Sequence, residues 1–384
     1  MSKQPQKPFL EDSLVHNKRA RSSFGAFLEK QNIVLSFKRY FIDALGAMAL
    51  GLFASLLIGT ILNTIAMVFP EGSAMQDNVQ QIASFATQAT GAAMAVAIGY
   101  ALQAPPLVLF TLAGVGLAAN GLGGAGGPLA VFFVAILACE LGKLVSKVTP
   151  VDIIVTPLVT LLSGGGIALL LAPAIGSLAN QIGAFVISLT DQQPFIMGVL
   201  VSVIMGILLT LPISSAAIAA SFGLVGLAGG AGLAGCCAQM VGFAVISYKE
   251  NRVGGLLAQG LGTSMLQMPN IIRNPRVLIP PTLASAITGP IATVLFRMEM
   301  NGPAISSGMG TSGLVGPIGQ VTGWFVPSEI AMNHGAAVMQ VGVWQWIQLL
   351  LICIVLPALL SYLIAIPLRK MQWIKDGDLK LQLQ

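Results

Sequence analysis

The sequence predicts an all-α polytopic membrane protein with about eight to ten transmembrane helices and re-entrant hairpins. Of its 384 residues, 55% are hydrophobic and only 9% are charged, and the mean hydropathy is +0.85. An ordinary globular domain has about a quarter of its residues charged. Several apolar runs also reach the ~20 residues that a helix needs to cross a bilayer.

Seven apolar runs are long enough, or nearly long enough, to span. They are 41–69, 79–102, 128–148, 194–213, 231–247, 276–296 and 343–368. Between them lie shorter apolar pieces that glycine and proline interrupt, which is typical of half-helices, kinked spans or re-entrant hairpins. These pieces are 105–119, 150–173, 214–228, 255–268 and 303–325.

A charge-free segment rich in Gly, Ser and Thr occupies residues 302–319. So flexible a backbone cannot face lipid, because unpaired N–H and C=O groups cost several kcal/mol each in hydrocarbon. We therefore expect this segment to line a cavity or to be buried in protein, and we interpret it as part of a substrate pathway.

Charge placement divides the chain into a basic cytoplasmic segment (1–38), a transmembrane domain (39–370) and a cytoplasmic tail (371–384). The first segment has no cleavage site after a short apolar region, so it is not a signal peptide. Acidic residues mark the expected outer loops: Glu71, Asp77 and Asp191. Basic residues mark the expected inner loops and tail: Lys143, Lys147, Lys249, Arg252, Arg273, Arg276, Arg369, Lys370 and Lys375. The positive-inside rule then places both termini in the cytoplasm, with an even number of crossings.

The basic N-terminal segment contains Lys18, Arg19 and Arg21, followed by aromatic and aliphatic residues such as Phe24 and Phe37. It either lies on anionic membrane lipid as an amphipathic helix or forms a solvated tail. The net charge of +5 does not indicate nucleic acid, because the basic residues gather at the ends and in short loops.

The sequence has no pattern typical of a metal site, a nucleotide loop or a hydrolytic triad, and we expect no metal and no other cofactor. The four cysteines lie in apolar runs without paired spacing, so we interpret them as packing residues. They are Cys139, Cys236, Cys237 and Cys353.

A weak internal repeat suggests two related halves with a binding site between them, as in many transporters. Residues 115–127, which include Asn120, resemble 225–235, and 150–157 resemble 269–275 with one residue deleted. Chance likeness between Gly-rich apolar stretches is the rival explanation. Asn120, in the Gly-rich part of the first copy, is a candidate solute ligand.

The segment Asn274-Pro275, followed by Leu278-Ile279-Pro280, resembles the helix opening of the membrane subunits (enzyme IIC) of the bacterial sugar phosphotransferase system. The likeness is to the stand-alone, perfringolysin-regulator-like (PfoR-like) branch and covers about residues 35–370. It implies a homodimer in the bacterial inner membrane. It also implies a sugar site formed by re-entrant hairpins, a mobile transport domain, and phosphorylation by a separate IIB protein.

The chain departs from this family pattern at one motif. Gln267 or Met268 stands where a sugar IIC carries a Glu before proline, so the family's catalytic carboxylate does not carry over to this loop. No hydrophilic segment is long enough to fold as a IIA or IIB domain. Enzymatic activity is therefore open; if present, it would be sugar phosphotransfer together with separate IIA and IIB proteins.

Phosphoryl transfer to a sugar hydroxyl needs a base and hydrogen-bonding groups that position the sugar. We assign the catalytic role to Glu299, which otherwise is a loop charge paired with Arg297. Amide and guanidinium candidates for solute binding are Asn270, Arg273, Asn274 and Asn301. Arg273 serves equally well as a positive-inside marker.

Hydroxyl candidates for solute binding lie in the Gly-rich segment: Ser306, Ser307, Thr311 and Ser312. Small residues there are also explained by close packing. His334, four residues after Ile330 and five after Glu329, is a candidate for a proton relay or a solute contact, with a surface-loop histidine as the alternative. Glu140 is expected to pair with Lys143, and Asp152 to lie at a helix N-terminus.

The leading function is a membrane transport subunit of IIC type that binds and translocates a sugar or sugar-like solute. Two alternatives stand beside it. One is a non-phosphorylating secondary carrier of a small solute, anions included. The other is a membrane sensor or regulator that signals through its basic N-terminal segment.

Overall fold

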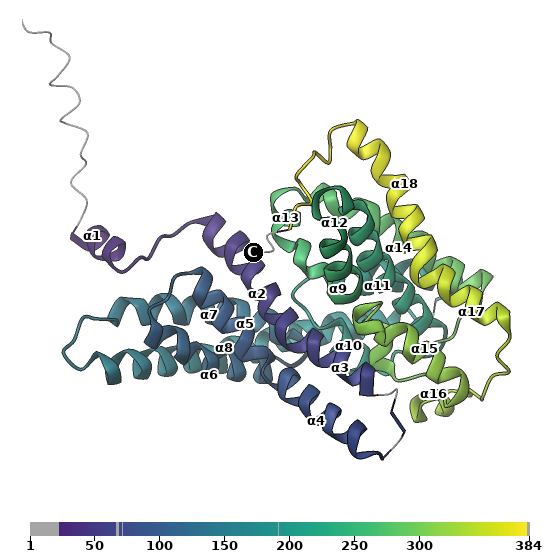
Figure 1. The fold of residues 1–384 in the computed structure, drawn as a ribbon, viewed down its shortest axis with the longest axis horizontal. Coiled ribbons are helices and arrows are strands. Elements are labelled where there is room, and N and C mark those ends of the chain that lie inside the picture. Colours follow the sequence, from purple (N-terminus) through teal and green to yellow (C-terminus); the bar gives the residue numbers. More distant parts are fainter. Residues whose placement is uncertain (1–22, 67–68, 71, 191, 382–384) are drawn as a thin grey trace, which may run out of the picture.

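The computed structural model describes residues 23–66, 69–70, 72–190 and 192–381 (Figure 1). The fold is 80% helical, and the described residues contain no strand beyond an isolated antiparallel bridge between Gly226 and Met300. This confirms the all-α prediction. Several residues used above as markers lie outside the described residues: Lys18, Arg19, Arg21, Glu71 and Asp191.

Six helical stretches in the described part of the chain are long and apolar enough to cross a membrane, which confirms a polytopic membrane protein. They are Lys38–Ala66, Pro106–Val145, Asp152–Ser188, Gly226–Ile246, Pro275–Leu295 and Val343–Lys370. A pair bent by 45°, Ala74–Gln88 and Thr90–Ala101, raises the number to seven if it forms one span. The number of full crossings predicted above, eight to ten, stays a prediction.

The stretch Pro106–Val145 is a hairpin of α6 (Pro106–Gly123) and α7 (Gly127–Val145). A Cβ on Gly142 would lie 2.9 Å from a methyl carbon of Val108, whereas one straight helix would separate these residues by about 50 Å. Gly124 makes the turn with a φ of +50°, which glycine adopts without a steric penalty. The apolar helix α9 (Pro194–Thr210) is shorter than a typical span.

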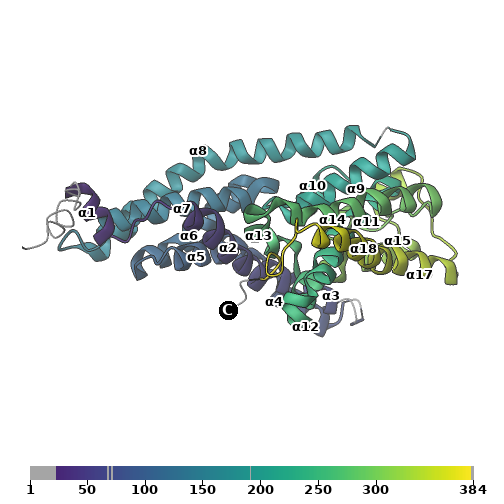
Figure 2. The same ribbon diagram turned by 90° about the horizontal axis from the view of Figure 1, so that it is seen from above.

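The first half of the chain forms a bundle of α5 (Thr90–Ala101), α6, α7 and α8 (Asp152–Ser188), on the left of Figure 1. Small buried residues recur every three or four positions along α8: Thr156, Thr160, Gly164, Ala168, Ala172, Gly176, Ala179 and Gly183. Most of this face packs against the hairpin, and Gly183 packs against Phe222. Its other face exposes leucines such as Leu162, Leu169 and Leu170. Figure 2 shows α8 running along one side of the molecule.

The second half of the chain packs around α11 (Gly226–Ile246), whose most apolar 18-residue window is 94% buried. Helices α9, α14 (Ile279–Pro290) and α18 (Leu356–Lys370) surround it. Glycines in α11 let these backbones approach closely: a Cβ on Gly235 would clash with the carbonyl oxygen of Ser202.

The remaining helices connect or cover these two groups. They are α1 (Ser23–Lys30), α2 (Ala44–Leu52), α3 (Ile58–Ala66), α4 (Ala74–Gln88), α10 (Ser215–Ser221), α12 (Tyr248–Leu257), α13 (Met268–Arg273), α15 (Val315–Phe325), α16 (Glu329–Asn333) and α17 (Val343–Leu350). Helices α2 and α3 run diagonally between the two groups in Figure 1.

The Gly-rich segment 302–319 is buried, as the sequence predicted. It forms two short 3-10 turns, Ala304–Gly308 and Ser312–Leu314, which pack against α10, α11 and α3. Gly302 and Gly319 face each other so closely that a Cβ on Gly302 would overlap the Gly319 carbonyl oxygen. Backbone that is neither helix nor strand is thus shielded from lipid by protein.

The repeated sequence segments have different local structures. Residues 115–127 end one helix and turn into the next, whereas 225–235 begin the long helix α11. Residues 150–157 begin α8, whereas 269–275 form the short helix α13 and a following 3-10 turn. These segments therefore follow different backbone paths, and a two-fold repeat of the whole domain stays a prediction.

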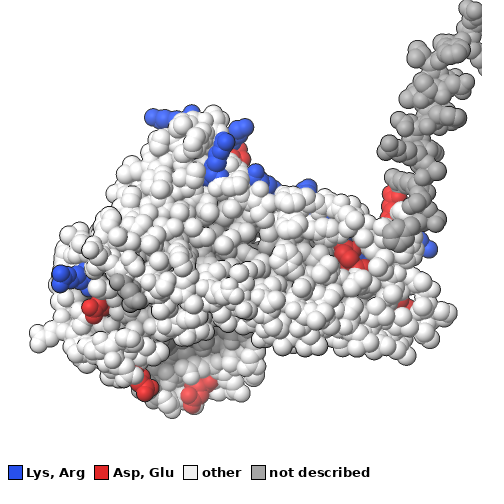
Figure 3. All heavy atoms as spheres, turned by 180° about the vertical axis from the view of Figure 1, so that it is seen from behind, with Lys and Arg blue, Asp and Glu red and all other residues white. Residues whose placement is uncertain are grey.

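Basic residues gather at one end of the molecule. In Figure 1 helices α12 and α13 and the end of α18 lie at the top, and the turn between α7 and α8 lies at the far left. The end of α3, α16 and the start of α17 lie toward the lower right. In Figure 3, Lys and Arg concentrate along the upper edge, and the broad middle is almost free of charge. A 3.2 Å ion pair confirms the predicted pairing of Glu140 with Lys143. All four cysteines are buried and free, which confirms that they are packing residues.

Candidate functional site

A cavity of about 390 Å³ lies between the chain that follows α14, helix α15, and the connection from α16 to α17. Its polar lining residues are Arg297, Glu299, Asn301, Gln320, Gln345 and Gln348, beside Phe296 and Trp324. The cavity thus combines one carboxylate and one guanidinium with amides and aromatic rings.

An extended backbone presents Glu299 to this cavity. Met300 exchanges two 2.9 Å backbone hydrogen bonds with Gly226 at the start of α11, and the amide of Met298 donates to Ala292 at 2.8 Å. Side chains alternate along extended backbone. Met298 and Met300 are therefore buried in the core, while Glu299 points outward and is exposed.

Two amides hold the residues around Glu299. The Asn301 Nδ2 atom donates a 3.4 Å hydrogen bond to Glu299 Oε2, and Gln320 Nε2 donates a 2.7 Å hydrogen bond to the Glu299 carbonyl oxygen. Asn301 and Gln320 are 3% and 1% exposed. The carboxylate is therefore carried on a backbone that α15 fixes in place.

Gln320 also has an unused acceptor. Its buried Oε1 atom has no hydrogen-bond partner within the described residues, although nearly all buried polar atoms in proteins have one. Sequence analysis missed Gln320. The available signal was an isolated amide within the apolar stretch 315–325, beside the Gly-rich segment.

Aromatic side chains wall the other side of the cavity. Trp324 is 3% exposed and meets Trp346 edge to face, with ring centroids 5.2 Å apart. Phe296 meets Trp344 in the same way at 5.8 Å. Such perpendicular pairs are favourable arrangements of aromatic rings and fix the ring faces in place.

The predicted hydroxyl ligands lie in the Gly-rich segment and do not line this cavity. Ser307 donates to the Leu224 carbonyl oxygen at 2.7 Å, and Thr311 donates to the carbonyl oxygen of Gly260. Ser306 packs against Gly319. Ser312 lines a smaller cavity of about 60 Å³, mostly apolar, and its Oγ has no partner within the described residues.

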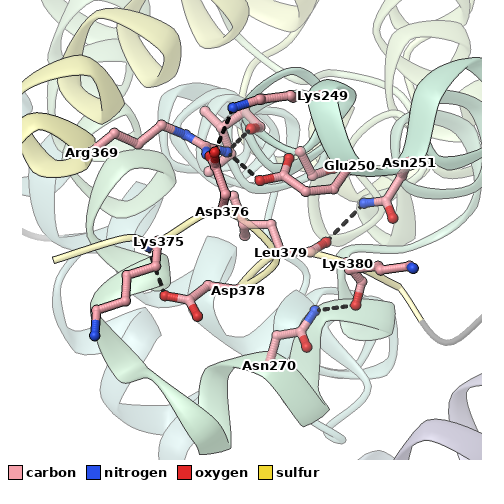
Figure 4. Close-up of polar contacts among 12 residues, drawn as sticks. Lys249, Glu250, Asn251, Asn270, Arg369, Lys375, Asp376, Asp378, Leu379 and Lys380 are labelled. Carbon is pink, nitrogen blue, oxygen red and sulfur yellow. Dashed lines mark hydrogen bonds and ion pairs between the residues drawn. The ribbon is translucent and has the colours of Figure 1, made fainter. Parts of the chain in front are cut away.

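The amides predicted around Arg273 lie against the C-terminal tail (Figure 4). Asn270 Nδ2 donates to the Lys380 carbonyl oxygen at 3.0 Å, and Asn274 Nδ2 donates to Asp378 at 2.8 Å. The side chain of Arg273 is exposed and makes no polar contact with the described part of the chain. These residues thus form a second cluster, separate from the Glu299 cavity.

The remaining candidates lie apart from both groups. Asn120 is half-buried in the last turn of α6. His334 is exposed, and its Nδ1 lies 2.8 Å from the Ile330 carbonyl oxygen, at a different cavity of about 440 Å³. Asp152 lies in the first turn of α8, where its Oδ1 accepts hydrogen bonds from the Lys147 amide and Thr156, both at 2.6 Å.

The Glu299 cavity and the basic tail lie at opposite ends of one spanning stretch. Gln345 and Gln348 belong to the first turns of Val343–Lys370, whose last residues are Arg369 and Lys370. At 1.5 Å per residue, these 28 residues extend about 40 Å, which exceeds the thickness of the hydrocarbon core. The cavity therefore lies near the end of this stretch that is remote from its basic last residues.

Comparison with known proteins gives one family. The family model described as "Phosphotransferase system, EIIC" matches residues 42–381. Neither curated proteins nor solved structures give a significant match. The family match covers every described residue of the Glu299 cavity and the helices that carry it.

Proposed function

The chain belongs to the phosphotransferase system EIIC family and is a membrane transport subunit of that system, and we propose that it binds a sugar or sugar-like solute in the Glu299 cavity. The observation that carries the proposal is the pairing of Glu299 with the buried amide Gln320 in one cavity of a charge-poor domain. A polar cavity with a few convergent hydrogen-bonding groups in an otherwise apolar domain is the usual form of a small-solute site.

The cavity's chemistry suits a neutral polyol. Carboxylate and amide oxygens accept hydrogen bonds from hydroxyls, amide N–H groups donate to them, and ring faces cover the C–H face of a sugar. Gln320 Oε1 is buried behind the wall in this conformation, and leaving such an atom unpaired costs about 1–3 kcal/mol. A shift of the wall on solute binding would let a hydroxyl supply the missing donor.

We assign Glu299 the role of general base in phosphoryl transfer from a separate IIB protein. The sugar hydroxyl oxygen forms a bond to phosphorus, the bond between phosphorus and the carrier breaks, and the hydroxyl proton passes to the Glu299 carboxylate. Asn301 orients the carboxylate through its 3.4 Å hydrogen bond. The general base would thus be Glu299 rather than a residue of the loop at Gln267 and Met268.

We also propose an orientation of the protein in the membrane. The basic end of the molecule faces the cytoplasm of a bacterial cell, with both termini there, as the positive-inside rule requires. The described conformation then opens the Glu299 cavity to the outside. Because a IIB protein acts from the cytoplasm, the cavity must become accessible from inside before transfer, through movement of the domain that carries it. The family kinship further suggests a homodimer.

A binding experiment tests the proposal. The full-length protein, purified in detergent, is heated with neutral sugars, sugar phosphates or small organic anions, because a ligand of the folded state raises the melting temperature by mass action. We expect stabilisation by a neutral sugar, and loss of that stabilisation in Gln320→Met. Stabilisation by anions alone, unaffected by Gln320→Met, would overturn the sugar site.

A secondary carrier without phosphotransfer is the second candidate. It is favoured by the absence of a carboxylate at Gln267 and Met268 and by the engagement of Asn270 and Asn274 with the tail. Uptake into liposomes that contain the protein but no phosphocarrier would support it. Sugar phosphate formed only when IIB and its phosphoryl donor are present would support group translocation.

A further inference from the structure

A second large cavity, of about 670 Å³, forms a groove between the end of α11, helix α12 and the end of α18. Its walls include Val245, Leu256, Tyr362 and Ile366, and its upper rim carries Lys249, Arg252 and Arg369. It shares no lining residue with the Glu299 cavity. The groove thus has an apolar body and a cationic rim.

The cationic rim contains N–H donors that make no hydrogen bond within the described residues. Arg369 is committed to Glu250 at 2.8 Å and to Asp376 at 3.2 Å (Figure 4). Lys249 donates to Asp376 at 2.7 Å, which uses one of its three N–H groups, and its side chain is 66% exposed. Arg252 makes no polar contact with the described residues and keeps all five N–H donors.

The backbone at Arg252 is strained. Its φ of +54° interrupts α12 and lies in the region that glycine favours. A non-glycine residue is held there at an energetic cost, and such positions concentrate at functional sites. The guanidinium of a strained residue thus lines the groove without a protein partner.

The position of the groove indicates a lipid rather than a free anion. The apolar stretch Val343–Lys370 ends at this rim, so the rim lies where hydrocarbon meets headgroups. Tyr248 and Tyr362 are 43% and 54% exposed, and exposed tyrosines are enriched at that boundary. Tyr362 precedes Arg369 by about 10 Å along α18, at the depth of the upper acyl chain.

We propose that this groove binds an anionic phospholipid, with Lys249 and Arg252 holding the phosphate and the apolar wall of α18 holding an acyl chain. A basic pocket between helices at the membrane surface is a recognised form of anionic headgroup site. Asp376 shows that an acidic group already bridges Lys249 and Arg369. The lipid phosphate occupies the remaining donors of Lys249 and the free guanidinium of Arg252.

The full-length protein, delipidated in detergent, tests this by thermal unfolding. It is titrated with phosphatidylglycerol, with phosphatidylcholine of the same acyl chains, or with inorganic phosphate. We expect phosphatidylglycerol to raise the melting temperature at low mole fraction and the other two to have little effect. Equal shifts with phosphatidylcholine would overturn the headgroup site, and equal shifts with inorganic phosphate would assign the rim to a free anion.

Two variants test whether the groove is the site at which phosphatidylglycerol binds. Arg252→Gly removes the cation but suits the positive φ, so the fold is retained, and we expect the apparent affinity for phosphatidylglycerol to fall about fivefold. Lys375→Gln removes an exposed cation of the tail that does not line the groove, and should leave the affinity unchanged. An equal loss in both variants would mean general charge attraction, and no loss in Arg252→Gly would refute the site.

Discussion

Gln320 Nε2 donates a 2.7 Å hydrogen bond to the backbone carbonyl oxygen of Glu299, across 21 residues of chain. This bond joins α15 to the extended segment at Met298–Asn301 and closes the Gly-rich segment between them into a fixed unit. Movement of the Gly-rich segment and α15 would therefore carry Glu299 along. The carboxylate, the amide and the irregular backbone are thus parts of one structural element.

Glu299→Gln should abolish sugar phosphorylation while sugar binding persists. The amide has nearly the same shape and keeps hydrogen bonding to hydroxyls, but it cannot take up a proton. We expect phosphorylation to fall at least ~100-fold, as is typical for loss of a general base, with the sugar Kd changed by less than about tenfold. Phosphorylation is measured in vesicles supplied with the phosphocarrier proteins. Glu329→Gln, an exposed carboxylate outside the cavity, is the control, and retained phosphorylation in Glu299→Gln would remove the assignment.

Gln320→Met should weaken sugar binding and loosen the Glu299 segment together. The change keeps side-chain volume but removes both the donor to Glu299 and the unpaired Oε1 acceptor. A buried carbonyl left without its donor costs about 1–3 kcal/mol, so we expect a lower melting temperature and about tenfold weaker sugar binding by calorimetry. Gln348→Met, also in the cavity wall, should weaken binding without the stability loss. Equal stability of both variants would contradict the linking role of Gln320.

Gly302→Ala should destabilise the protein, because its Cβ would overlap the Gly319 carbonyl oxygen. Overpacking of a tight interior costs about 1–3 kcal/mol. Gly165→Ala is the matched control, since nothing lies within 4 Å of that Cβ on helix α8. Thermal unfolding in one detergent compares the two. A melting temperature of Gly302→Ala at or above that of Gly165→Ala would mean that the Gly-rich segment is loosely packed.

Features that depend on amino-acid composition were predicted from the sequence. Contacts between residues far apart in the chain were not. Hydropathy identified the membrane class, and the cost of unpaired backbone identified 302–319 as buried. Spacing along the chain separated 105–119 from 128–148 but left open whether the shorter piece is a half-helix, a kinked span or part of a hairpin. The proximity of Val108 to Gly142 shows that the two form a hairpin. Glu299 and Asn301 lie two residues apart in the sequence and were predicted together. Gln320 reaches them only through the tertiary fold, and the tail that binds Asn270 follows it by more than 100 residues.

The attachment of the C-terminal tail should be insensitive to pH from 8 to 5 and fail in stronger acid. The hydrogen bond and positive charge of Lys249 lower the pKa of Asp376 below its ordinary value of 3.8. A lowered pKa stabilises the folded state above the ordinary value, and this contribution is lost as pH falls through the lowered pKa. Because Asp376 is exposed, added salt should weaken the attachment as well.

Hydrogen exchange at 371–381, corrected for the intrinsic pH dependence, measures tail attachment. Asp376→Asn should lower protection already at pH 7 and make the remaining protection less sensitive to salt. Lys370→Gln, a basic neighbour without an ion pair among the described residues, is the control and should leave protection unchanged. Full protection in Asp376→Asn would show that the backbone contacts to Asn251 and Asn270 hold the tail without the ion pairs.

Cysteine labelling should place the Glu299 cavity outside and the tail inside the cell. All four native cysteines are buried, so an introduced cysteine reports its own position. Ala337→Cys lies in the cavity wall and is exposed, so a membrane-impermeant maleimide added to intact cells should label it. Lys375→Cys, also exposed, should react only after permeabilisation. The reverse pattern would invert the topology and open the described conformation to the cytoplasm, where Glu299 would meet a phosphocarrier without any movement. Loss of Ala337→Cys labelling when a sugar is added, with Lys375→Cys unchanged, would further show that the solute occupies or closes this cavity.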